Sequence, residues 1–174
     1  MIQLQDKGAE VARRRGLVID DGQMHLVDEV LAKLRQVSGA KFVALVSTSG
    51  QPITTSPTNV ESDTLSLAAL AASSFAATRQ LAEVLNEREF TLLFHEGKES
   101  NLHVVQVTEQ ILLLIAFGRE TQVGRVRLYT SRALEVLKPV FEPAEDKAGE
   151  TALMDRDYST QAGEAIDGLF RVEE

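Results

Sequence analysis

Apolar residues recur at helical spacing in three segments of the chain. The first segment runs from Gln23 to Val37 and is followed by Gly39, a residue type that often ends helices. The second segment runs from Ser62 to about Asn86, and the third runs from about Gln122 to Phe141. Pro139 disfavours the last turn of the third segment, because proline has no backbone N–H to donate. These patterns predict three amphipathic helices.

Five shorter segments have the composition of β-strands. The segment KFVALVS (residues 41–47) and the segment Pro52 to Thr55 flank a turn-forming sequence, which predicts a hairpin. Three more strands are expected at Glu89 to His95, at LHVVQVT (residues 102–108) and at Gln110 to Phe117. The last of these is almost continuously apolar, so we expect it to be buried on both faces of a sheet or at the centre of a dimer.

The order of these elements is helix, two strands, helix, three strands, helix, which predicts an α+β fold with one five-stranded sheet sandwiched by helices. We expect residues 21–142 to form this domain and residues 1–20 to be an N-terminal extension. Residues 143–162 are acidic and contain few apolar side chains, so we expect a flexible linker there.

Residues 163–174 are expected to form a short amphipathic helix. Ile166, Leu169 and Phe170 recur at i, i+3, i+4 spacing, which places three apolar groups on one side of a helical turn. Such a short helix is not stable alone, so we expect it to form when it binds another surface.

Composition and charge exclude several functions. The chain has 174 residues and a net charge of −8, which argues against a general grip on nucleic acid because phosphate binding requires a basic surface. The Arg13–Arg15 run is interpreted as a solvated arm, since acidic residues lie near it. There is no cysteine, which excludes disulfides and thiolate chemistry. No apolar run is long enough for a membrane span or a secretory signal, so we expect a cytoplasmic protein.

Sequence motifs for catalysis and cofactor binding are missing. The chain has no phosphate loop, no GxGxxG and no GxSxG. His95 and Glu96 begin a pattern similar to a zinc-binding helix, but Glu99 stands where the second histidine belongs. His95 and His103 could face each other across neighbouring strands, yet two histidines without a third ligand are more simply ordinary strand residues. We therefore expect no enzyme, no metal and no cofactor.

The second predicted helix carries two stripes. One has heptad-like spacing and is interpreted as the face on the sheet; it consists of Leu67, Leu70, Ser74, Ala77, Leu81 and Val84. The other is rich in small side chains and is interpreted as a partner-binding platform; it consists of Leu65, Ala69, Ala72, Ser73, Ala76, Arg79, Gln80 and Glu83. Small side chains let another backbone come close, but alanine is also the best helix former, so helix propensity explains the same composition. Two such helices side by side in a homodimer would form a groove suited to one asymmetric guest.

Five segments together resemble the Roadblock family and, within it, the MglB-like proteins. They are LVSTSGQPI, SDTLSLAALAASSFAATRQLAEVL, the strand ending in FHEG, ILLLIAF and VGRVRLYTSRALEVL. Their order and spacing carry the resemblance, which covers roughly Gln23 to Phe141. The terminal EAIDGLF also resembles the end of some MglB-like chains, whereas the Arg-containing N-terminal extension matches nothing in the family.

The resemblance implies a homodimer whose paired second helices bind one MglA-like small Ras-like GTPase. It implies that the dimer stimulates GTP hydrolysis by reorganising the GTPase's own active site, without supplying a catalytic residue. It also implies a role in bacterial cell polarity or motility, with concentration at a cell pole. In such proteins a C-terminal helix can contact the GTPase and promote nucleotide exchange, and Ile166, Leu169 and Phe170 are the matching residues here.

Three other interpretations are compatible with the sequence. Arg79, Arg88 or Arg119 could act as an arginine finger, which contributes about 10³ to 10⁵ in hydrolysis rate. A dimeric Roadblock scaffold would bind its partners without changing a GTPase rate. A small-ligand sensor is disfavoured, because the sequence places no polar cluster in an obvious apolar pocket.

Overall fold

A computed structural model describes residues 19–58, 62–142 and 166–171 of the chain. Five strands form one antiparallel sheet in the order β2-β1-β5-β4-β3. The strands are β1 (Phe42–Ser47), β2 (Pro52–Ser56), β3 (Leu92–His95), β4 (Ser100–Thr108) and β5 (Ile111–Gly118). The predicted linker over residues 143–162 and most of the predicted N-terminal extension lie outside the described residues.

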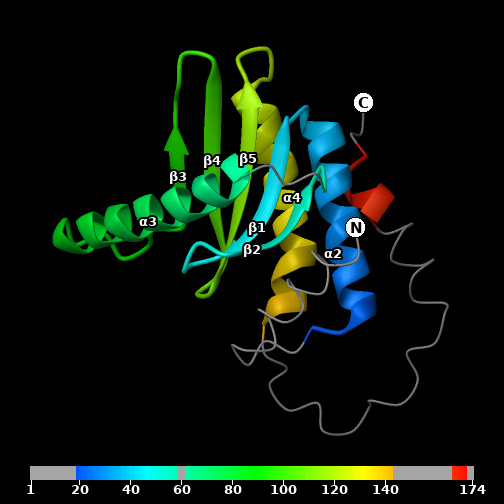
Figure 1. Ribbon diagram of the computed structural model, residues 1–174, viewed down its shortest axis with the longest axis horizontal. Coiled ribbons are helices and arrows are strands. Elements are labelled where there is room, and N and C mark those ends of the chain that lie inside the picture. Colours follow the sequence, from blue (N-terminus) through cyan, green and yellow to red (C-terminus); the bar gives the residue numbers. More distant parts are fainter. Residues whose placement is uncertain (1–18, 59–61, 143–165, 172–174) are drawn as a thin grey trace, which may run out of the picture.

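Helices cover both faces of this sheet. Helix α3 (Ser62–Val84) crosses one face, whereas α2 (Asp21–Ser38) and α4 (Val123–Phe141) lie on the other (Figure 1). The predicted α+β sandwich with a five-stranded sheet is therefore confirmed. In the C-terminal part of the chain, residues 166–169 form a helical turn.

Helix α2 is defined at both ends by its sequence. At its start, the Asp20 carboxylate accepts a hydrogen bond of 2.7 Å from the backbone N–H of Gln23, and the Gln23 side chain accepts one of 3.0 Å from the backbone N–H of Asp20. This reciprocal pair satisfies two N–H groups that have no partner within the helix. At its end, Gly39 adopts φ +75°, a left-handed conformation that glycine adopts without steric cost.

Helix α4 continues through the proline that disfavours its last turn. Pro139 lies inside the helix, which ends at Phe141. The backbone N–H of Glu142 still bonds to the carbonyl of Lys138 at 2.9 Å, and the Phe141 side chain is only 2% exposed. Burial of this ring holds the last turn on the sheet despite the hydrogen bond that proline removes.

Strand β5 lies at the centre of the sheet and contributes to two cores. Ile115 and Phe117 pack in the core beneath α2 and α4, whereas Leu112 and Leu114 pack in the core beneath α3. Successive side chains of a strand point to opposite faces, so a strand covered on both sides must be apolar at almost every position. The prediction that this segment is buried on both faces is confirmed.

The face of α3 that packs on the sheet is not the predicted one. Ala68, Ala71, Ala72 and Phe75 are the buried residues at this contact, at i, i+3, i+4, i+7 spacing. The predicted core stripe is wrong, since Leu70, Leu81 and Val84 are exposed by 66%, 58% and 77%. The alanines allow α3 to approach the sheet closely, and a single Phe75 fills the remaining space, with its ring centroid 4.9 Å from that of Phe90.

The hairpin between β1 and β2 also approaches α3 closely. Gly50 adopts φ +83° in this turn, and a Cβ atom at this position would lie 2.7 Å from the Cα of Ala69. A separation below 3.0 Å between a Cβ and a backbone atom requires the backbone to move, so only glycine fits. The turn therefore fixes the position of the N-terminal half of α3.

Candidate partner-binding surface

The outward surface of α3 carries the predicted platform, with one exception. Exposed positions of the platform are Leu65, Ala69, Ser73, Ala76, Arg79, Gln80 and Glu83. Ala72 is only 2% exposed and packs in the core beneath α3, so its assignment to the platform is wrong. The cause is geometric: Ala72 follows Ala68 by four residues and therefore lies on the sheet-facing side of the helix.

Short side chains keep this part of α3 smooth. The Ser73 hydroxyl donates a 2.8 Å hydrogen bond to the backbone carbonyl of Ala69, one turn earlier. Thr78 makes the same contact with the carbonyl of Ser74, also at 2.8 Å. These hydroxyl donors are satisfied within the helix, so a partner can lie against them without leaving a polar hydrogen unpaired.

Large apolar side chains missed by the sequence interpretation extend this surface. Leu70, Leu81, Val84 and Leu85 are all more than half exposed, and the last three lie near the C-terminal end of α3. Figure 1 shows that this end of the helix extends beyond strand β3, the open edge of the sheet. Single exposed leucines are ordinary, but several on one helix end mark an interaction surface. The heptad-like spacing of Leu70, Leu81 and Val84 is the sequence signal for this surface, and the interpretation of that spacing as a core face is wrong.

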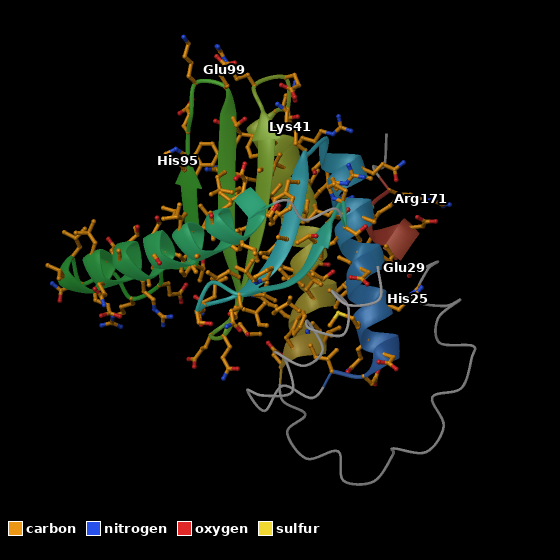
Figure 2. All side chains as sticks on the ribbon, viewed as in Figure 1. His25, Glu29, Lys41, His95, Glu99 and Arg171 are labelled. Atoms are coloured by element: carbon orange, nitrogen blue, oxygen red, sulfur yellow. The ribbon has the colours of Figure 1, made fainter. Side chains whose placement is uncertain are left out.

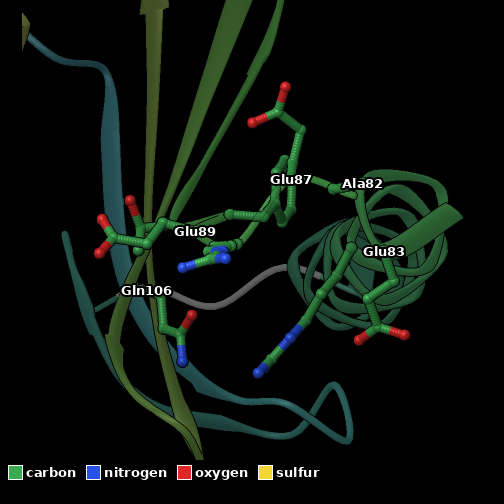
Figure 3. A pocket seen from close by; sticks show the side chains of 9 residues that line it. Ala82, Glu83, Glu87, Glu89 and Gln106 are labelled. Carbon is green, nitrogen blue, oxygen red and sulfur yellow. The ribbon is translucent and has the colours of Figure 1, made fainter. Parts of the chain in front are cut away.

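A pocket of about 220 Å³ lies below the end of α3 (Figure 3). Arg79 and Glu83 of α3 line it, together with residues that precede β3 and one residue of β4. The remaining lining residues are Ala82, Glu87, Arg88, Glu89, Phe90, Thr91 and Gln106. Two arginines face three glutamates here, so the pocket has no strong preference for an ion of either sign. Two of the three candidate finger arginines, Arg79 and Arg88, therefore line one pocket, and Arg119 is not part of its lining.

The two strand histidines lie on opposite faces of the sheet. In the β3–β4 ladder, Phe94 pairs with His103 and His95 pairs with Leu102, so His95 and His103 do not face each other. His95 is exposed at the β3 edge (Figure 2), whereas His103 is 1% exposed. Burial, with a smaller contribution from the Arg127 charge, lowers the pKa of His103 to about 4, so this side chain is neutral at pH 7.

Features of two other classes of protein are absent from the described residues. Within residues 19–58, 62–142 and 166–171, no three His, Cys, Asp or Glu side chains are grouped so that they could hold a metal ion. In the same part of the chain, no helix has the length and apolar character that crossing a membrane requires.

The predicted C-terminal anchors lie away from α3. Ile166 and Phe170 are 5% and 4% exposed and belong to the core on the α2 and α4 side of the sheet, and Leu169 packs against it while remaining partly exposed. The structure thus places the two sets of candidate partner residues on opposite faces of the sheet.

An antiparallel sheet with one helix on one face and two on the other is the architecture expected of a Roadblock protein. The Roadblock/LC7 domain family matches residues 26–117, which is more than half of the chain, and the chain belongs to this family.

Within the family, the chain is similar to MglB. It is 35% identical to Myxococcus xanthus MglB, with a TM-score of 0.62, over 66% of this chain and 94% of that chain. It is 28% identical to the gliding protein MglB of Thermus thermophilus, with a TM-score of 0.63, over 68% of this chain and 90% of that chain. A Roadblock/LC7 domain from Streptomyces avermitilis shares the fold at 17% identity and a TM-score of 0.59, over 64% of this chain and 94% of that chain. No curated protein sequence matches the chain.

Proposed function

We propose that this protein is a homodimeric, non-catalytic regulator that stimulates GTP hydrolysis by an MglA-like small Ras-like GTPase in bacterial cell polarity or motility. The observation that carries the proposal is the similarity to M. xanthus MglB, which extends over 94% of that chain. In this proposal residues 21–142 are the regulatory domain, and residues 143–162 link it to a C-terminal helix within residues 163–174. The protein acts in the cytoplasm and concentrates at a cell pole.

Exposed apolar side chains at one end of α3 support the homodimer. Leu81, Val84 and Leu85 extend past the open β3 edge, and full burial of a leucine or valine side chain contributes roughly 1.5–3 kcal/mol. A second copy with the same surface offers a self-complementary partner, as a two-fold dimer requires. A solved MglB in a tetrameric arrangement, 28% identical to this chain over 70% of it and 91% of that chain, shows that a relative of this chain self-associates.

The smooth surface formed by Ala69, Ser73 and Ala76 supports docking of the GTPase on α3. Its side chains are small and its hydroxyl donors are already bonded, so a partner loses little hydrogen bonding and little side-chain entropy when it binds. Arg79, Gln80 and Glu83 border this surface and provide polar contacts at its rim. In the dimer, two such helices form the groove that receives one GTPase.

Substitutions on α3 test this docking. Ala76→Arg places a long charged side chain on the surface and should abolish both complex formation and stimulated hydrolysis. Ser131→Arg is the matched control, because Ser131 is an exposed small residue on α4, on the other face of the sheet. Equal loss of activity in both variants would contradict docking on α3. Binding without stimulation by the unmodified protein would instead indicate a dimeric scaffold.

The substitution Arg79→Ala tests the proposal that this protein supplies no arginine finger to the GTPase. An arginine finger contributes about 10³ to 10⁵ in rate, or roughly 4–7 kcal/mol of the barrier, whereas a contact at the rim of the interface contributes far less. We expect Arg79→Ala to reduce stimulated hydrolysis by less than about tenfold. A return to the unstimulated rate with the complex intact would contradict the non-catalytic mechanism.

A further inference from the structure

The C-terminal segment (residues 166–171) is packed onto its own domain. Ile166 and Phe170 are 5% and 4% exposed, and the ring of Phe170 lies 6.0 Å, between centroids, from that of Tyr129 on α4. Figure 1 shows this segment in red beside α2, on the side of the sheet opposite to α3. The two anchoring side chains are therefore withdrawn from solvent by the chain that carries them.

Polar contacts hold the segment at both of its ends. Lys33 of α2 donates a 2.6 Å hydrogen bond from Nζ to Oδ1 of Asp167, and this contact lowers the pKa of the Asp167 carboxyl. Arg132 of α4 donates a 2.8 Å hydrogen bond from Nη1 to the backbone carbonyl of Arg171. The two helices that form the surface thus each contribute one cation to the segment.

The C-terminal segment is held by its docking surface as well as by its own backbone hydrogen bonds. Within residues 166–171, backbone hydrogen bonds run from Phe170 N–H to the carbonyl of Ile166 and from Arg171 N–H to the carbonyl of Gly168, both at 3.2 Å. Short helices are marginally stable in water, so protection of these two amides from exchange reports docking of the segment. Residues 143–165 separate the segment from α4, and a chain of that length spans up to roughly 75 Å.

We infer that the C-terminal segment is a latch that closes on α2 and α4 of its own chain and competes with the partner GTPase for Ile166, Leu169 and Phe170. The latch itself follows from the contacts described above. The competition rests on the proposed function, with Ile166, Leu169 and Phe170 as a second contact for the same GTPase beside the α3 surface. The GTPase engages the terminal helix only after the latch opens, which makes this contact conditional and leaves the α3 surface unaffected.

Charge reversal on the docking surface opens the latch without changing the segment itself. Lys33→Glu replaces attraction to Asp167 with repulsion, and we expect the amides of Phe170 and Arg171 to exchange their hydrogens about fivefold faster. Adding Arg132→Glu removes the second contact and should raise the increase to more than tenfold. Lys41→Glu is the matched control, because Lys41 pairs with Glu120 at 3.7 Å, outside the latch, and the two amides should exchange as in the wild type. Unprotected amides in the wild type, or unchanged rates in the double variant, would overturn the latch.

Cross-linking distinguishes a latch within one chain from a segment exchanged between chains. The chain has no cysteine, so Lys33→Cys combined with Asp167→Cys creates a unique pair for a bismaleimide. A cross-linked species that migrates as one chain on a denaturing gel is expected. A covalent dimer would show that the segment docks on a second copy and would overturn closure on its own chain.

The competition is tested with the MglA-like GTPase loaded with GDP. The Lys33→Glu/Arg132→Glu variant should bind it about tenfold more tightly than the wild type, because the wild type must first open the latch. Equal affinities, together with faster amide exchange in the variant, would overturn the competition while leaving the latch. If no variant binds the GDP-loaded GTPase, the competition fails, while the proposed function is decided separately by GTP hydrolysis, and the exchange and cross-linking results still decide whether the latch exists.

Discussion

One buried histidine is expected to make this protein less stable in acid. His103 lies on β4 between the sheet and α4, where Phe94 of β3 meets its ring at 6.3 Å between centroids, and its side chain is 1% exposed. No group in the described part of the chain bonds to its Nδ1 atom. The guanidinium of Arg127 lies 6.0 Å from the Phe94 ring centroid, and its charge further disfavours an imidazolium here. The folded protein therefore resists protonation of this ring.

The size of this stability loss in acid follows from the lowered pKa of His103. The pKa of His103 falls from 6.5 to about 4, a difference of about 2.5 units at roughly 1.36 kcal/mol each. Below pH 6.5 the unfolded chain binds a proton at this position and the folded protein does not. The free energy of unfolding therefore falls as the pH is lowered from about 6.5 to about 4, by roughly 3 kcal/mol in total, and the loss stops at lower pH, where both states are protonated.

Urea unfolding at pH 7.5 and pH 4.0 measures this loss. Between the two pH values, the wild type should lose about 3 kcal/mol more than His103→Leu, which has a similar volume and cannot titrate. His95→Leu is the matched control, since it removes an exposed histidine from the neighbouring strand, and its loss should follow that of the wild type. If His103→Leu loses as much stability in acid as the wild type, the assignment to His103 is refuted.

Three further predictions follow from single positions. Val84→Glu should convert the dimer to a folded monomer in sedimentation experiments, because this 77% exposed side chain lies at the proposed interface; a persistent dimer would refute that interface. Gly50→Ala should lower the free energy of unfolding by roughly 1–3 kcal/mol, because its Cβ would lie 2.7 Å from the Cα of Ala69; an unchanged urea midpoint would refute the close approach. Asp20→Ala should cost about 1 kcal/mol by removing the cap of α2, and a stability loss below a few tenths would contradict the capping box.

Elements with one clear pattern could be predicted from the sequence. The almost continuous apolar run of β5 can be buried only in the centre of a covered sheet, and the structure places it there. Gly39 ends α2 as expected, because its left-handed conformation favours glycine. In both cases a single physical requirement determines the local structure.

The orientation of α3 could not be predicted, because both of its sides are apolar. Burying the leucines at heptad-like spacing would remove more apolar area from water, whereas burying the alanines lets the helix pack closer to the sheet. The sequence alone does not say which of these two effects determines the buried face of α3. The contact with the sheet decides it here: Ala68, Ala71 and Ala72 let the helix lie close to the strands, and Phe75 fills the remaining space. The leucines are consequently exposed and extend the candidate site.

The packing of the terminal helix depends on contacts far apart in the sequence. The apolar spacing of Ile166, Leu169 and Phe170 predicts a binding face but does not identify the surface that receives it. The receiving surface is built by Lys33, Tyr129 and Arg132 on two other helices, which only the tertiary fold brings together. The same limit applies to His103, because strand register decides which neighbour it faces.

The most direct test of the proposed function is GTP hydrolysis by the MglA-like GTPase from the same genome, measured with and without this protein, alongside chromatography of the mixture. We expect a complex and a hydrolysis rate that rises with the concentration of this protein and saturates. A complex without a change in rate would contradict the regulator and indicate a scaffold, and the absence of any complex would contradict the proposed partner.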